Sequence, residues 1–176
     1  MHAQFEMIHP FKDGNGRVGR LLIPMLLFYK KVLPYPIFYI SRYFAENNDY
    51  YKERLANISK AKTTDGKIIA WKSWIDFFFD GVAQESIRHI DTSKKINAVH
   101  KDMTAIVNKT EMISLIDMLF DRLKLQPKEA IDELHLPPTS VRKELQHLAD
   151  NGYLTRTGSP RKTVYVFTKL IGIVEK

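Results

Sequence analysis

The stretch "IHPFKDGNGRVGR", residues 8–20, combines a histidine, an aspartate, three glycines and two arginines directly before an apolar segment. Glycines lower helix propensity, and charged groups need water or partners, so such a cluster is costly if it serves structure alone. The apolar run that follows has the length and composition of a helix. We therefore interpret the stretch as a functional loop that opens a helix, and we expect the fold to be organised around it.

A glycine-rich loop at a helix start leaves backbone N–H groups unpaired at the positive end of the helix dipole, which suits an anion. Asp13 would repel a phosphate unless a divalent cation lies between them. Arg17 and Arg20 are three residues apart, so both project from one helix face and can bind further phosphate oxygens. His9 can take a proton near neutral pH. Together these groups suit transfer from a nucleotide.

Taken one at a time, the same residues also have a structural interpretation. Asp13-Gly14 fits a turn, Gly16 eases entry into a helix, and the two arginines fit a solvated face. The glycine spacing matches G-x-G-x-x-G as well, but that dinucleotide motif follows a strand, and here a helix is expected before the loop. The combination of residues favours the functional interpretation.

The segment "HPFKDGNGR", residues 9–17, followed by Arg20, resembles the signature of Fic-family proteins, H-P-F-x-[DE]-G-N-G-R-x-x-R, at every defined position. The segment "YISRYFAENNDYYKERL", residues 39–55, and the C-terminal region also resemble the longer bacterial Fic proteins. The resemblance implies a mainly α fold in two domains. Residues 1–109 would be the C-terminal part of a Fic-type helical bundle, and residues 110–176 a winged helix-turn-helix domain with a small β-hairpin.

The resemblance also implies a protein adenylyltransferase, which transfers AMP from ATP to a Ser, Thr or Tyr hydroxyl of a target protein. His9 would be the general base, and Asp13 would hold Mg²⁺ against the phosphates. Gly16 favours this reaction, because Doc-type relatives that act as kinases carry lysine there. The other implied roles are nucleotide binding by Gly14, Asn15, Gly16, Arg17 and Arg20, and anchoring of the loop by Pro10 and Phe11.

The family's target-docking flap precedes the motif, and this chain starts eight residues before His9. We therefore expect low transfer activity from this chain alone. The helix after the loop is apolar nearly all round, so we expect it to be buried in a bundle, or else to promote self-association.

The spacing of apolar residues and of breakers predicts the remaining elements of the first region. Residues 41–62 fit one or two short helices that end before a turn at Asp65-Gly66. The expected ranges are a helix end at 2–7, a loop at 8–14, helices at 15–32, 68–82 and 93–107, and a connector at 37–40.

From residue 110 the pattern predicts three helices, followed by a hairpin in "YLTRTGSPRKTVYVF", residues 153–167. This is the layout of a winged helix-turn-helix, with residues 140–150 as the recognition helix and 158–162 as the wing tip. Gln146 and His147 are the side chains of that helix best suited to base edges. The possible DNA contacts are Arg142, Lys143, Arg156, Arg161 and Lys162.

The net charge of +7 lies mostly in residues 1–109, with 17 basic and 11 acidic residues, whereas residues 110–176 carry 10 and 9. An interaction module without DNA binding therefore stays open for the second region. A DNA-binding regulator with a vestigial or nucleotide-sensing Fic half is the alternative function. The chain has no cysteine, which excludes disulfides and zinc–thiolate sites, and we expect a cytoplasmic protein without membrane contact.

Overall fold

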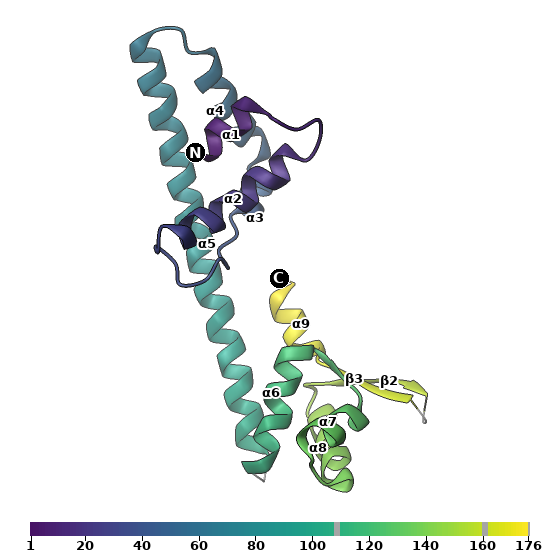
Figure 1. The fold of residues 1–176 in the computed structure, drawn as a ribbon. Coiled ribbons are helices and arrows are strands. Elements are labelled where there is room, and N and C mark those ends of the chain that lie inside the picture. The colour runs from purple at the N-terminus through teal and green to yellow at the C-terminus, as the bar shows by residue number, and fades with distance from the viewer. Residues whose placement is uncertain (108–109, 160–161, 176) are drawn as a thin grey trace. The chain divides into compact units, whose positions relative to one another are not determined.

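The computed structural model describes residues 1–107, 110–159 and 162–175. They form two compact units, Met1–His89 and Ile90–Lys176, each with its own core. The long helix α5 (Thr64–Ile106) contributes to both units (Figure 1). The division expected from the sequence, between residues 109 and 110, falls just after α5 and beside residues 108–109, which lie outside the described ranges. The identity of the two regions as domains stays a prediction.

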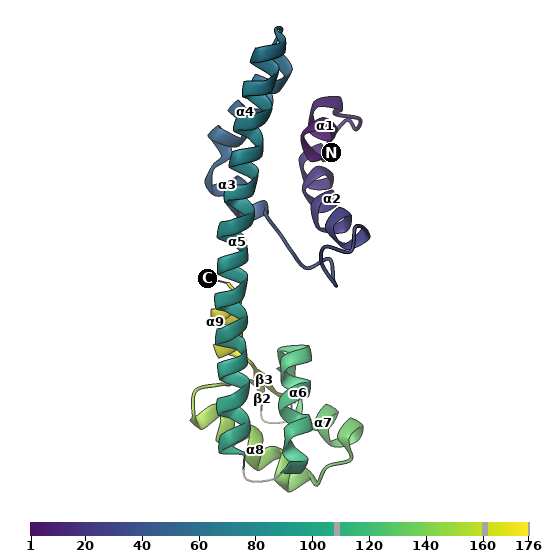
Figure 2. The same ribbon diagram turned by 90° about the vertical axis from the view of Figure 1, so that its left-hand side faces the viewer.

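Before α5, the first unit contains α1 (His2–Ile8), α2 (Asn15–Tyr29), α3 (Ser41–Glu46) and α4 (Asn48–Lys60). The predicted pair of short helices between residues 41 and 62 is confirmed as α3 and α4. The helix predicted over residues 15–32 is confirmed, but it ends at Tyr29 because the chain turns into the left-handed region at Lys31, where φ is 57°. Helices α3 and α4 lie beside the N-terminal half of α5 (Figure 2).

The turn predicted at Asp65-Gly66 and the separate helix predicted over 93–107 are wrong. Both segments belong to α5, which runs for 43 residues. The hydroxyl oxygen of Thr63 accepts the backbone N–H of Gly66 at 3.1 Å, so a side-chain cap starts the helix where a turn was expected. Residues 82–106 contain neither glycine nor proline, so nothing in that segment interrupts the helix.

Aromatic rings dominate the core of the first unit. The ring of Phe44, on α3, stacks on Tyr51 of α4 at 4.6 Å between centroids and lies 6.0 Å from Phe77 of α5. Trp74 of α5 lies between them, 5.8 Å from Tyr51 and 6.0 Å from Phe77. Large buried rings contribute the most apolar area per residue, so this cluster fixes α3 and α4 on α5.

Helix α2 is not buried all round, contrary to the expectation from its composition. Ile23 and Pro24 are buried, whereas Leu21, Met25 and Phe28 are 53%, 53% and 48% exposed. Only one face of α2 finds neighbours among the described residues. The opposite face therefore presents a row of apolar side chains at i, i+4 and i+7.

The second unit contains the predicted three helices and hairpin. These are α6 (Ile113–Arg122), α7 (Pro127–Leu134) and α8 (Pro138–Asp150), followed by strands β2 (Thr155–Ser159) and β3 (Lys162–Val166). Gly152 ends α8 at φ 77°, as its sequence predicted.

Three elements of this unit were not predicted: the 3₁₀ turn η1 (Thr110–Met112), strand β1 (Lys124–Leu125) and helix α9 (Thr168–Val174). The sheet is antiparallel in the order β1-β3-β2. Leu125 of β1 pairs with Tyr165 of β3, which in turn pairs with Arg156 of β2. The chain is thus mainly helical, with one small sheet.

The core of the second unit is mainly aliphatic with a few aromatic rings, and its fully buried members include Leu115, Leu119, Leu145 and Phe167. Met103 of α5 is also fully buried among them, so the C-terminal part of α5 completes this core. Within the described ranges, no helix is both long enough and apolar enough to span a membrane.

Candidate functional site

The motif loop joins α1 to α2 and begins in a conformation that costs energy. His9 ends α1 with φ 51° and ψ 57°, in the left-handed region, while its N–H still donates to the carbonyl oxygen of Phe5 at 3.0 Å. Gly14 precedes α2 with φ 82°, where glycine carries no penalty. A non-glycine residue in the left-handed region is uncommon and clusters at functional sites. His9 therefore occupies a backbone conformation that glycine would adopt at a lower free-energy cost.

Asn15 holds the loop closed. Its Oδ1 accepts the N–H of Phe11 at 2.9 Å, and its Nδ2 donates to the carbonyl oxygen of Phe11 at 2.6 Å. Asn15 is 2% exposed, so these bonds are shielded from water. Phe11 was expected to anchor the loop in a core, but its ring is 51% exposed and lies 6.2 Å from Phe5. Pro10 is exposed as well. Within the described residues the loop is tied mainly through its backbone.

Asp13 and Arg17 stand at the solvent side of the loop. The carboxylate Oδ2 of Asp13 lies 3.3 Å from Arg17, with 93% and 77% of the two side chains exposed. Its Oδ1 accepts the N–H of Gly14 at 2.6 Å. An exposed ion pair of this kind contributes about 0–1 kcal/mol, so it is easily exchanged for a ligand.

The start of α2 leaves backbone donors open. The first intrahelical bond runs from the N–H of Val18 to the carbonyl oxygen of Gly14, at 3.0 Å. The N–H groups of Asn15, Gly16 and Arg17 therefore have no acceptor within the helix. Gly16 also leaves room here, because a Cβ at this residue would lie 3.0 Å from the guanidinium of Arg20.

A cavity of about 620 Å³ lies against this helix start. His9, Gly16 and Arg20 line it from the motif side, which brings the predicted base, one predicted amide and one predicted arginine together. Arg17 and Asp13 are not among the lining residues. The opposite wall comes from α4 and consists of Asn48, Tyr51, Lys52, Leu55, Ala56 and Ser59.

Sequence reasoning did not assign the α4 wall to the site. Residues 48, 52, 55 and 59 are spaced by three and four, so they share one helix face, and that spacing was the available signal. The spacing does not say which segment the face meets. The packing of α1 against α4 supplies that information.

At the wall of the cavity, Glu6, His2 and Arg20 surround the hydroxyl of Tyr51. Burial raises the pKa of Tyr51, and the nearby Glu6 carboxylate adds to this effect. Burial also lowers the pKa of His2, against a backbone hydrogen bond to Gly19 that raises it. Oε1 of Glu6 is buried and has no hydrogen-bond partner among the described residues. Glu6, His2 and Tyr51 therefore form a polar cluster around Arg20.

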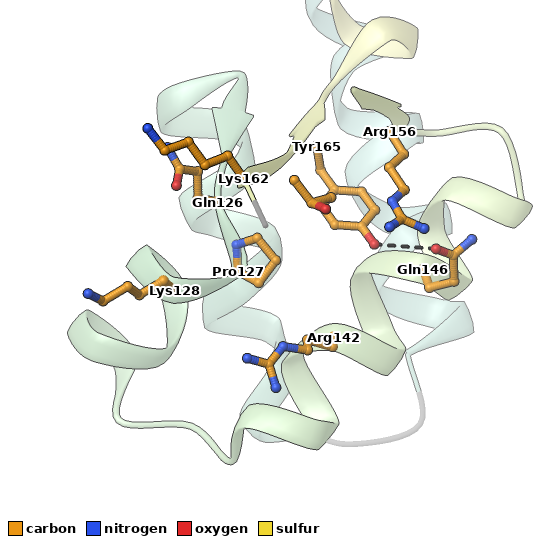
Figure 3. A pocket seen from close by; sticks show the side chains of 9 residues that line it. Gln126, Pro127, Lys128, Arg142, Gln146, Arg156, Lys162 and Tyr165 are labelled. Atoms are coloured by element: carbon orange, nitrogen blue, oxygen red, sulfur yellow. Dashed lines mark hydrogen bonds between the residues drawn. The ribbon is translucent and has the colours of Figure 1, made fainter. Parts of the chain in front are cut away.

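The second unit contains a separate basic hollow of about 380 Å³ (Figure 3). It collects three of the predicted DNA contacts, Arg142 of α8, Arg156 of β2 and Lys162 of β3. Lys143 does not line it and instead borders a different hollow of α8. The predicted contact Arg161 lies outside the described residues. The further lining residues are Gln126, Pro127, Lys128, Gln146, Thr163 and Tyr165.

Comparison with known proteins places the motif loop in a family. Residues 1–27 match the model of the Fic/DOC family. The chain is 65% identical over 26 residues to a probable protein adenylyltransferase of Aquifex aeolicus (strain VF5), which is 15% of this chain and 8% of that protein. It is 43% identical over 72 residues to a Fido domain-containing protein of Dictyostelium discoideum, which is 40% of this chain and 46% of that protein.

The fold and the site thus define a mainly helical protein with a glycine-rich motif loop at a helix start. The matches support a Fic-family protein, over the part of the chain that they cover. The chain spans less than half the length of these two relatives, and the family match ends within α2.

Proposed function

We propose that this chain carries the catalytic motif of a Fic-type protein adenylyltransferase. One observation carries the proposal: His9, Gly16 and Arg20 line the same cavity at the open start of α2. A base, free amides and a cation are the groups needed to bind a triphosphate and to take a proton from an attacking hydroxyl. The name of the Aquifex relative supports the same reaction class.

In the proposed reaction, the hydroxyl oxygen of a target side chain attacks the α-phosphorus of ATP. A new P–O bond forms, the bond from the α-phosphorus to the bridging oxygen breaks, and pyrophosphate leaves with that oxygen. The hydroxyl proton goes to a ring nitrogen of His9. The amides of Gly14, Asn15 and Gly16 hold phosphate oxygens, and Arg17 and Arg20 bind the β and γ phosphates.

The residues present fit Mg²⁺ bound together with the nucleotide. Magnesium in nucleotide sites is held by one or two carboxylates, with phosphate oxygens and water completing its shell. Asp13 supplies one exposed carboxylate beside the phosphate-binding amides. When bound, Mg²⁺ would neutralise phosphate charge.

The target protein docks outside the cavity and presents a Ser, Thr or Tyr hydroxyl to His9. The second unit, with its helices α6 to α8 and its hairpin, matches the layout of a winged helix-turn-helix, and we propose that fold for it. We place the protein in the cytoplasm, where ATP and Mg²⁺ are supplied together.

The test is label transfer from ATP. The full chain is incubated with Mg²⁺ and ATP labelled at either the α or the γ phosphate, together with a cell extract, and protein-bound label is measured. Measured against the same extract without the chain, whose own kinases transfer the γ phosphate, the proposal expects additional label from the α position alone. Label from the γ position alone would indicate a kinase and contradict the proposal, and so would failure of the chain to bind Mg²⁺–ATP by calorimetry.

A further inference from the structure

The basic hollow of the second unit concentrates positive charge that the unit as a whole does not carry. Residues 110–176 have a charge of only +1, yet Lys128, Arg142, Arg156 and Lys162 all border the hollow. No carboxylate lines it among the residues that the structure describes. The four cations come from four different elements, α7, α8, β2 and β3, so the fold and not one local run of sequence brings them together.

The two neighbouring cations of α8 lie in different surroundings. Arg142 borders the basic hollow, whereas Lys143 borders a second hollow that also contains Glu144, His147 and Asp150. Successive helix residues point about 100° apart, so the separation follows from helix geometry. An anion is therefore expected to bind at the face of Arg142 and not at the face of Lys143, where carboxylates would repel it.

The polar floor of the hollow is already engaged. The hydroxyl of Tyr165 donates to Oε1 of Gln146 at 3.3 Å, and Nε2 of Gln146 donates to Oδ1 of Asp150 at 2.7 Å. Gln146, the side chain best suited by sequence to a base edge, thus already makes one hydrogen bond at each end of its amide, and Figure 3 shows the one from Tyr165. The four cations that border the hollow are side chains of the kind that neutralises phosphate charge on DNA.

We infer that this hollow binds the phosphodiester backbone of duplex DNA. Cations on four different elements can each meet a different phosphate of a nucleic-acid chain. Arginine forks on α8 and β2 can each hold one phosphate through two N–H bonds. The inference does not depend on the proposed transfer reaction, because it concerns residues of the other unit.

The test is fluorescence anisotropy of a labelled random-sequence duplex with the full chain at 50–200 mM salt. The inference predicts binding that weakens linearly in a plot of log affinity against log salt concentration, by about 0.9 per phosphate contact. Arg142→Gln with Arg156→Gln should lower the slope by about two contacts, or about 1.8. The matched control, Lys124→Gln with Lys169→Gln, removes two exposed cations outside the hollow and should keep the wild-type slope.

Three outcomes would overturn the inference. One is the absence of duplex binding at the lowest salt concentration, and another is an equal loss in the two double variants. The third is displacement of the duplex by tripolyphosphate at matched phosphate concentration, since a small anion would then be the ligand. A circular dichroism spectrum of each variant shows that a loss of binding is not a loss of folding.

Discussion

The hydroxyl of Tyr51, on α4, lies 3.2 Å from Nε2 of His2, on α1. Nδ1 of the same ring lies 2.9 Å from the carbonyl oxygen of Gly19, on α2. Because a carbonyl oxygen only accepts, Nδ1 carries the hydrogen, and the neutral ring then accepts from Tyr51 at Nε2. One buried histidine therefore joins the three helices that surround the motif loop.

This arrangement predicts a pH dependence for the stability of the first unit. Burial lowers the pKa of His2 below the ordinary value of 6.5. As the pH falls below about 6.5 the unfolded chain binds the proton first, so the free energy of unfolding decreases. Both tryptophans, Trp71 and Trp74, lie in the first unit, so their fluorescence in urea titrations reports this unit alone. His2→Gln should flatten the dependence, and an unchanged dependence would contradict the assignment.

The Tyr51 hydroxyl should contribute to stability through the same bond. Tyr51→Phe leaves Nε2 of His2 buried without its donor, which costs about 1–3 kcal/mol. The neighbouring Tyr50 is 59% exposed and provides a matched control. Tyr50→Phe should change the urea midpoint by an amount equivalent to about 0.5 kcal/mol or less. Equal effects of the two substitutions would show that the hydrogen bond to His2 does not account for the loss of stability.

Gly81, inside α5, allows a close approach to α3. A Cβ at this residue would lie 2.5 Å from Cδ1 of Tyr43 and 3.0 Å from Cδ1 of Ile40. Both side chains are buried, so Gly81→Ala should destabilise the first unit, although alanine is the better helix former by about 1 kcal/mol. Gly172, in α9, has no atom within 4 Å of such a Cβ, and Gly172→Ala should leave the second unit as stable or more so. Thermal melts followed by tryptophan fluorescence and by circular dichroism test the pair.

The exposed row on α2 predicts self-association. Leu21, Met25 and Phe28 are each about half exposed and lie on one face. Burying a few hundred Å² of such surface would gain several kcal/mol at about 25 cal/mol per Å². Light scattering coupled to size exclusion should show a mass that rises with concentration, and Met25→Lys should reduce it. Ile87→Lys, at an exposed apolar residue of α5, is the control, and a concentration-independent monomer would contradict the prediction.

The parts of the site that lie close together in the sequence could be predicted, and the parts that depend on packing could not. His9, Gly16 and Arg20 were identified as a set because one loop and one helix turn bring them together. Asn48 and Lys52 were missed because the residue spacing in their helix indicates only that they share one face. The spacing does not indicate which helix packs against that face. The hydrogen bonds from the Asn15 side chain to the backbone of Phe11 were also missed, because an asparagine side chain in this loop could equally well bind a ligand.

The fold shows the same division. Helices α6, α7 and α8 of the second unit follow from their apolar spacing, and the stop at Gly152 follows from its freedom to adopt a positive φ. The turn at Asp65-Gly66 was predicted wrongly because the cap donated by Thr63 turns the same residues into a helix start. Strand β1 has only two residues, Lys124 and Leu125, and it exists because β3 offers an edge for it to pair with. No local pattern encodes such a strand.

Two loop residues should separate nucleotide binding from transfer. Asp13→Ala removes the carboxylate proposed to hold Mg²⁺ and should weaken the Mg²⁺-dependent binding of ATP. The same substitution frees Arg17 from its ion pair, so binding of ATP without Mg²⁺ should not fall. Calorimetry with and without Mg²⁺ measures both quantities. Equal affinity of wild type and variant in the presence of Mg²⁺ would contradict the role given to Asp13.

The most direct measurement is the rate of AMP transfer from α-labelled ATP by His9→Ala beside the wild-type chain, with ATP affinity measured on the same samples. His9 is the proposed base and does not hold the phosphates in place. The account therefore predicts a transfer rate lower by roughly 10²–10⁴ with ATP binding close to that of the wild type. Transfer by His9→Ala at the wild-type rate would contradict the proposed mechanism.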